Sequence, residues 1–76
     1  MITVGSTVRI KAKVKAAWEK QGIYFPEACA GEMTVMEIEK PTVQDGVRYG
    51  GTRVSVQVEE RSDRWYNFEM KDVEEI

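Results

Sequence analysis

The chain has no histidine and a single cysteine, Cys29, among its 76 residues. Without histidine it lacks the commonest general base and metal ligand at neutral pH. One cysteine falls far short of the four ligands of a structural zinc site, and it excludes an internal disulfide. Small neighbours predict that Cys29 is a partly buried apolar side chain. A lone thiol is typical of a reducing compartment, so we expect a cytoplasmic protein.

Other features are also missing. No apolar run approaches the roughly 20 residues that cross a bilayer, and no signal-peptide pattern opens the chain, so we expect no membrane association. Gly50-Gly51 lacks the further glycines and the lysine of a phosphate-binding loop. The serines have no candidate base, and the carboxylates are scattered. The sequence therefore predicts a chain that is not an enzyme and holds no metal and no small-molecule cofactor.

The residues that are present favour a folded domain. Hydrophobic residues make up 42% of the chain and charged residues 32%, and seven aromatic residues argue against disorder. The net charge of −2 conceals an asymmetry. Residues 1–20 carry five cations and one anion, whereas residues 21–76 carry six cations and twelve anions. Where these charges meet in space depends on how the strands pair.

A basic alternation opens the chain. Apolar and basic residues alternate over residues 8–15, which predicts a half-buried strand with Val8, Ile10, Ala12 and Val14 inward. The outward row has a spacing of roughly 7 Å that suits a phosphate backbone. This row consists of Arg9, Lys11, Lys13 and Lys15. The alternative interpretation is a solvated face neutralised by acidic neighbours.

The next segment, residues 16–32, breaks the alternation and predicts a long loop. Residues 16–21 favour a short helical turn that ends at Gly22. Further along, Asp45-Gly46 predicts a two-residue hairpin turn. A bulge at Gly50-Gly51 then improves the register of the flanking strands. In that register Ile38 faces Val54, Met36 faces Val56, Thr34 faces Val58 and Glu39 faces Arg53.

The last third of the chain predicts another hairpin. A three-residue loop over 61–63 pairs Val58 with Tyr66, Val56 with Phe68 and Val54 with Met70. In this register Tyr66, Phe68 and Met70 point into the core, while Trp65, Asn67 and Glu69 point outward. Residues 71–73 predict one helical turn and residues 74–76 a short closing strand.

These elements predict a single all-β domain over residues 1–76. Their order favours an SH3-like five-stranded small barrel with a long first loop and one short helical turn before the last strand. A barrel removes the problem of free sheet edges, because its last strand lies against its first. Glu74 and Glu75 are then expected beside the basic row.

Three segments carry a resemblance to a known group: Val4 to Ile10, Gly31-Glu32, and Phe68 to Glu74. They resemble the SH3-like electron-transport accessory proteins, a group that includes the variable chain of ferredoxin–thioredoxin reductase and the E subunit of photosystem I. Members of that group are non-catalytic subunits that dock to larger redox proteins. The resemblance implies the same kind of role here.

The aromatic residues supply the candidate partner-binding site. Trp18, Tyr24 and Phe25 lie in the long first loop, and Trp65 is expected to point outward. Exposed aromatic rings grip peptides and anchor interfaces. The alternative is that the loop folds back and its rings plug an open end of the barrel.

Three functions remain open at this point. The first is a non-catalytic protein-binding or accessory subunit that docks to a larger protein, such as a redox complex. The second is a small barrel that binds nucleic acid through its basic first strand, with help from aromatic stacking. The third is a subunit that completes the active site of a partner enzyme.

Overall fold

The computed structural model describes the backbone of residues 1–76 and all side chains except that of residue 49. The chain is mostly β, as expected. The elements in chain order are β1 (Thr7–Ile10), α1 (Ala12–Gln21), η1 (Glu27–Ala30), β2 (Met33–Glu39), β3 (Thr42–Gln44), β4 (Val47–Tyr49), β5 (Arg53–Gln57), η2 (Glu59–Arg61), β6 (Tyr66–Glu69), η3 (Met70–Asp72) and β7 (Val73–Glu75). The elements labelled η are 3₁₀ turns.

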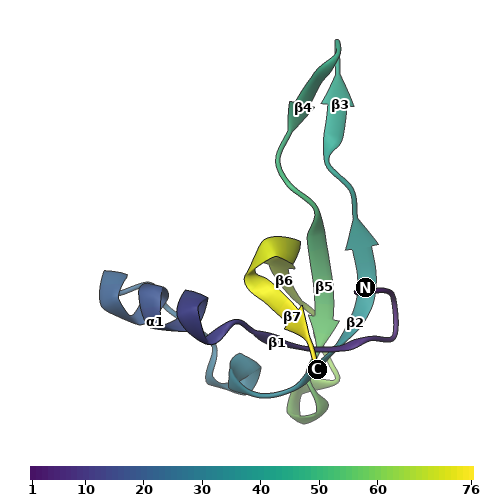
Figure 1. The fold of residues 1–76 in the computed structure, drawn as a ribbon. Helices are drawn as coiled ribbons and strands as arrows, with labels where there is room; N and C mark the ends of the chain where they lie inside the picture. The colour runs from purple at the N-terminus through teal and green to yellow at the C-terminus, as the bar shows by residue number, and fades with distance from the viewer.

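Five strands form one antiparallel sheet in the order β6-β5-β2-β1-β7 (Figure 1). The prediction that the last strand lies against the first is confirmed, since β7 pairs with β1 and places Glu74 opposite Arg9. The one-turn η3 precedes that last strand, also as predicted. The sheet is open, because its two outer strands, β6 and β7, are not hydrogen-bonded to each other in the described backbone. The predicted closed barrel is therefore absent.

The strand predicted over residues 8–15 is wrong beyond Ile10. Residues 12–21 form α1 instead, and the helix ends at Gly22, whose φ of 73° is left-handed. Alanine, lysine, glutamate and glutamine dominate this segment and favour a helix. Val14 and Trp18, four residues apart on one helix face, pack against the core, while Ala12 is exposed. Helix α1 thus includes the helical turn predicted over residues 16–21, and the rest of the predicted loop contains η1.

The predicted hairpin turn is confirmed. Gln44 pairs with Val47, and both turn residues have positive φ angles, 53° at Asp45 and 75° at Gly46. Two positive φ angles define the turn that matches the twist of a two-stranded ribbon. Strands β3 and β4 form their own small sheet, which projects away from the rest of the molecule (Figure 1).

The extra residue expected at Gly50-Gly51 is also confirmed, because Ile38 pairs with Val54 and Glu39 with Arg53. The remaining predicted pairs of this ladder are wrong. A second register shift lies between Val35 and Glu37, so Val35, rather than Met36, faces Val56. Thr34 pairs with Gln57 instead of Val58. The shift turns Met33 and Val35 into the core and leaves Thr34 exposed.

The register predicted between β5 and β6 is wrong by two residues. Val56 pairs with Tyr66 and Val54 with Phe68, because η2 and the following turn take up more chain than a three-residue loop. A slip of two keeps every side chain on its predicted face. Tyr66 and Phe68 accordingly pack against the core, while Trp65 is exposed.

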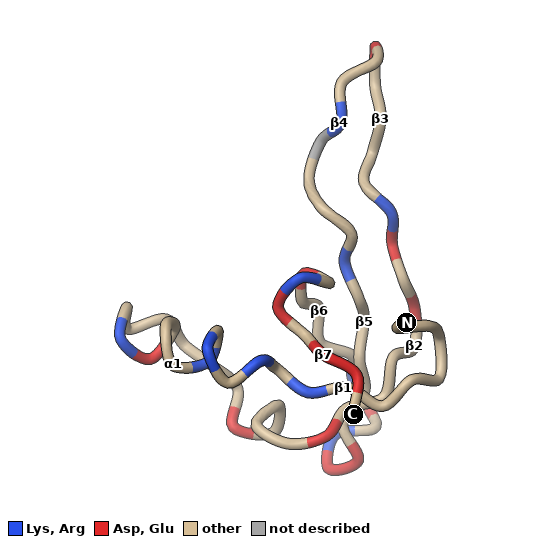
Figure 2. The backbone as a smooth tube through the Cα atoms, in the orientation of Figure 1, with Lys and Arg blue, Asp and Glu red and all other residues tan. Residues whose placement is uncertain are grey.

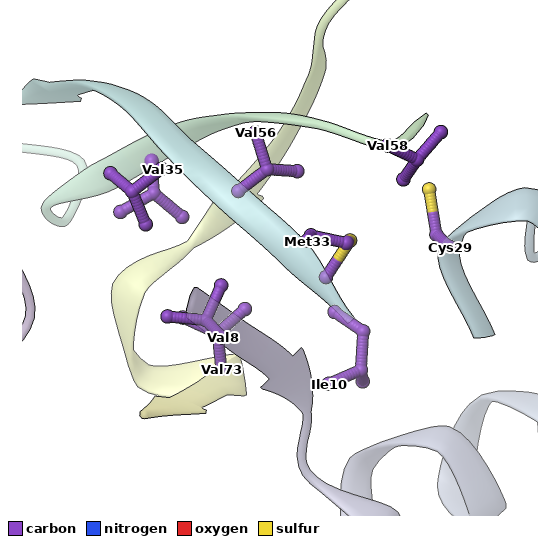
Figure 3. Close-up of a cluster of buried hydrophobic side chains, with 9 residues drawn as sticks. Val8, Ile10, Cys29, Met33, Val35, Val56, Val58 and Val73 are labelled. Atoms are coloured by element: carbon purple, nitrogen blue, oxygen red, sulfur yellow. The ribbon is translucent and has the colours of Figure 1, made fainter. Parts of the chain in front are cut away.

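The core consists of small and medium-sized apolar side chains from several strands and from η1. Figure 3 shows most of them converging from both sides of β2. The buried residues are Val8, Ile10, Cys29, Met33, Val35, Val54, Val56, Val58 and Val73. Six of these nine are valines, whose branched side chains suit a pleated surface. Larger side chains, among them Trp18, Phe25 and Phe68, close the core at its margin.

Candidate functional site

Three aromatic rings join α1, the segment after it and strand β6. Trp18 of α1 stacks on Phe68 of β6, with ring centroids 6.2 Å apart and planes inclined by 17°. The ring of Phe25 also contacts the indole, with centroids 5.8 Å apart and planes inclined by 41°. All three rings are half-buried. Trp18 and Phe25 thus belong to the margin of the core, which is the plug that the sequence left as one alternative.

Beside these rings lies a cavity of about 250 Å³, called here the aromatic groove. One wall is the segment Ile23–Pro26, and the opposite wall is β6. Its lining residues are Trp18, Ile23, Tyr24, Phe25, Pro26, Arg53, Asn67, Phe68, Glu69 and Asp72. This volume is below the roughly 300–1,000 Å³ of typical small-molecule sites, so it suits one or two side chains of a partner.

The rim of the aromatic groove is exposed and apolar. Tyr24 is 86% exposed and Ile23 48% exposed. Exposed tyrosine beside a preformed apolar hollow is the composition of an interface anchor. The segment Ile23–Pro26 therefore contains one exposed ring, Tyr24, which is available to a partner, and one partly covered ring, Phe25.

Trp65 is the fourth predicted partner-binding residue, and it does not line the aromatic groove. It immediately precedes β6 and is 48% exposed. Along the strand direction it comes two residues before Asn67, and side chains two apart share a face. The structure thus brings Trp18, Tyr24 and Phe25 together and places Trp65 further along the same edge strand.

The basic row of the sequence does not form one line. Arg9 is on β1, where its Nε lies 3.1 Å from Glu74 Oε1, as expected of an acidic neighbour. Lys11 is the N-cap residue that precedes α1, and Lys13 and Lys15 lie near the start of the helix. Figure 2 shows these cations along β1 and α1, with carboxylates on the adjacent β7. Lys15 reaches the candidate site, because its Nζ is 5.8 Å from the centroid of the Phe25 ring.

Sequence reasoning missed the polar residues of the aromatic groove. The sequence predicts that Asn67 and Glu69 point outward and that Arg53 faces Glu39, and it gives none of the three a role in binding. Asn67 Oδ1 accepts a hydrogen bond of 2.7 Å from the Ser55 hydroxyl across the β5–β6 pair. Glu69 lies 3.3 Å from Lys71 Nζ. Only the packing of α1 against β6 shows that these residues border a cavity, and no local sequence signal carries that information.

Cys29 is fully buried in η1, and its sulfur points towards Val58 (Figure 3). Burial raises the pKa of the thiol above its ordinary value, because the thiolate is poorly solvated there. Among the described side chains, no group of three or more His, Cys, Asp or Glu residues is arranged to hold a metal ion. No described helix is both long enough and apolar enough to cross a membrane.

Comparison with known proteins gives no relative. No protein-family model, no curated protein and no solved structure matches this chain. Function is therefore inferred from the residues, the groove and the sheet edge of this chain.

Proposed function

We propose that the chain is a non-catalytic protein-binding or accessory subunit that docks to a larger protein. The observation that supports this proposal is the aromatic groove with the exposed ring of Tyr24 at its rim. Rigid aromatic rings bury a large area at a low cost in conformational entropy, which is why they dominate interfaces. Ile23 extends the apolar rim, and Trp65 supplies a second exposed ring beside β6.

We also propose that the fold is SH3-like in its strand arrangement, with the sheet left open between β6 and β7. It is supported by the strand order β6-β5-β2-β1-β7 and by the single turn η3 before the last strand. A redox complex is the partner that the resemblance to electron-transport accessory proteins suggests. Within this proposal the chain contributes surfaces to the complex and leaves the chemistry to its partner.

The experiment is quantitative capture of partners from a cell extract by the immobilised chain. Changing both Tyr24 and Trp65 to alanine should abolish capture, since both rings are exposed and their loss leaves the core intact. Val4→Ala is the matched control, because Val4 is 63% exposed and lies outside the aromatic groove. Equal capture by the folded double variant and the wild-type chain would contradict the proposal.

Nucleic-acid binding is the second candidate function. One observation favours it: Lys11, Lys13 and Lys71 border a single open hollow of about 400 Å³ beside α1. Converging lysines attract phosphates in a strongly salt-dependent manner. Retention on an immobilised single-stranded oligonucleotide at about 50 mM salt, lost in a Lys11→Ala/Lys13→Ala variant, would support it. No retention at that salt would exclude it.

A subunit that completes a partner's active site is a special case of the first proposal. It requires that the captured partner be inactive alone and gain activity when the chain is added. Full activity of the isolated partner would leave the chain as a docking subunit only.

A further inference from the structure

Strand β6 forms one free edge of the five-stranded sheet. In an antiparallel pair, residues alternate between those that bond the neighbouring strand and those whose backbone groups point away from it. The Met70 N–H donates to the Thr52 carbonyl at 2.8 Å, which fixes the phase of this alternation. With the pairing of Arg53 opposite Glu69 and Ser55 opposite Asn67, the N–H and C=O groups of Asn67 and Glu69 point away from β5.

This edge is open, whereas the opposite edge of the sheet is protected. At the other end, β7 carries Glu74, bound to Arg9, and Glu75, 3.1 Å from the amino terminus. Charged side chains of this kind discourage another strand from pairing. On β6 the only charged side chain is Glu69, and no proline interrupts the strand.

The open edge of β6 forms part of the lining of the aromatic groove. Asn67, Phe68 and Glu69 of β6 all line the groove, and the facing wall is the segment Ile23–Pro26. A strand added to β6 would therefore run through the groove. Alternate side chains of such a strand would point towards Trp18 and Phe68 on one face and towards Trp65 on the other.

The charges around the groove define the partner further. Arg53 lines the groove and Lys15 lies over Phe25, and neither has an ion pair within the described part of the chain. Glu69, by contrast, is already paired with Lys71. The charged lining residues without an ion pair are thus Arg53 and Asp72, and Lys15 adds a second cation beside Phe25. An acidic residue next to an apolar one in the partner complements this arrangement.

We propose that the aromatic groove binds an extended segment of a partner protein, which adds to β6 as a sixth strand and places an apolar side chain, flanked by an acidic one, against Trp18 and Phe68. This inference rests on the proposed protein-binding function and specifies its geometry. Main-chain hydrogen bonds supply affinity in this mode of recognition, and the groove supplies the choice of side chain.

The edge is tested with a pair of substitutions at one position. Glu69 has a φ of −76°, which proline adopts without strain, and its N–H points away from β5. Glu69→Pro therefore removes an edge donor and leaves the β5–β6 ladder in place. Glu69→Ala is the matched control, since it removes the same carboxylate and keeps the N–H. We expect the proline variant to bind roughly fivefold or more weakly than the alanine variant, because both lack the carboxylate and only the proline variant lacks the N–H.

The probe is a set of ten-residue peptides with a central leucine in a threonine and valine background, flanked by glutamate or by lysine. Binding is measured by the fluorescence of the tryptophans of the chain. Glutamate-flanked peptides should bind more tightly, and salt should reduce the difference. Two peptides are N-methylated at every second amide, one at the odd positions and one at the even positions. Methylation of the amides that bond β6 should weaken binding about tenfold or more, while methylation of the alternate amides should be tolerated. The N-methylated peptides are measured with the wild-type chain, so they test the proposal even if the Glu69→Pro variant does not fold.

The outcomes separate the two proposals. The proposal of a sixth strand is overturned if both N-methylated peptides lose the same affinity. It is also overturned if no peptide in the set binds. Capture of a folded partner that survives Glu69→Pro but not the Tyr24 and Trp65 changes overturns it too, and leaves the protein-binding function intact. Dimerisation of the chain alone, abolished by Glu69→Pro in sedimentation experiments, would identify a second copy as the occupant and also overturn it.

Discussion

The indole of Trp18 lies stacked on the ring of Phe68 at 6.2 Å and so connects α1 with the edge strand β6. This contact joins residues 50 positions apart in the sequence. It closes one end of the core and forms the floor of the aromatic groove. A single ring thus contributes to the stability of the fold and to the shape of the candidate site.

We expect Trp18→Ala to lower the free energy of unfolding by about 2 kcal/mol, because the half-buried ring loses its apolar and stacking contacts. Urea unfolding followed by circular dichroism measures this loss. Trp18→Phe should cost less, since it keeps an aromatic ring on Phe68. Trp65→Ala serves as the control and should change stability by no more than about 0.5 kcal/mol. Equal costs for Trp18→Ala and Trp65→Ala would contradict the stacked arrangement.

Val54→Ala should destabilise the fold by about 2 kcal/mol, because Val54 is fully buried opposite Phe68 and its loss leaves a cavity. The matched control is Val43→Ala on the projecting hairpin, where the side chain is 67% exposed. That variant should unfold within about 0.5 kcal/mol of the wild-type chain. Thermal unfolding of both variants shows whether the hairpin is as separate from the core as it is in Figure 1.

The end of α1 depends on the left-handed conformation of Gly22, which lets the N–H of Gly22 donate to the Glu19 carbonyl and the N–H of Ile23 donate to the Trp18 carbonyl. Gly22→Ala should cost about 1 kcal/mol, since a side chain disfavours positive φ. Gly31→Ala is the control, because Gly31 has a φ of −114° and open space around its Cα. A stability change at Gly31 as large as that at Gly22 would show that the effect does not arise from backbone conformation.

Cys29 should make the fold sensitive to alkaline pH. Burial raises the pKa of its thiol in the folded chain, so unfolding exposes a thiol that ionises more readily. The stabilising contribution is complete below the ordinary thiol pKa of about 8.5 and is lost as pH rises through the folded pKa. Urea unfolding between pH 7 and 10 measures it. Cys29→Ala should be less stable at pH 7 but should lose less stability between pH 7 and 10 than the wild-type chain does.

The same burial predicts a thiol that reacts slowly. Modification of Cys29 by a thiol reagent should be slow in the native chain and fast in urea, because the thiolate is both rare and covered in the folded state. Rapid reaction without denaturant would contradict the buried position of η1.

The errors in the predicted strand registers show which features the local pattern of apolar and polar residues does not predict. The predicted and the observed registers of β5 and β6 differ by two residues and bury the same side chains, so hydrophobic alternation does not separate them. The shift near Met36 likewise depends on how β2 bends between two neighbours. Residues 12–15 continue the period of two of the first strand, while Val14 and Trp18 also have the spacing of one helix face. Only contact with Phe68 and Phe25 distinguishes these alternatives.

By itself the sequence determined the features that depend on neighbouring residues: the hairpin turn at Asp45-Gly46, the end of the helix at Gly22 and the inward faces of β1, β5 and β6. These follow from φ preferences and from the alternation of side chains. The tertiary structure alone decided that residues 12–15 belong to the helix, that the sheet stays open at β6 and that the aromatic rings meet there. Those outcomes depend on packing between distant segments, and no local pattern records which distant surfaces fit together.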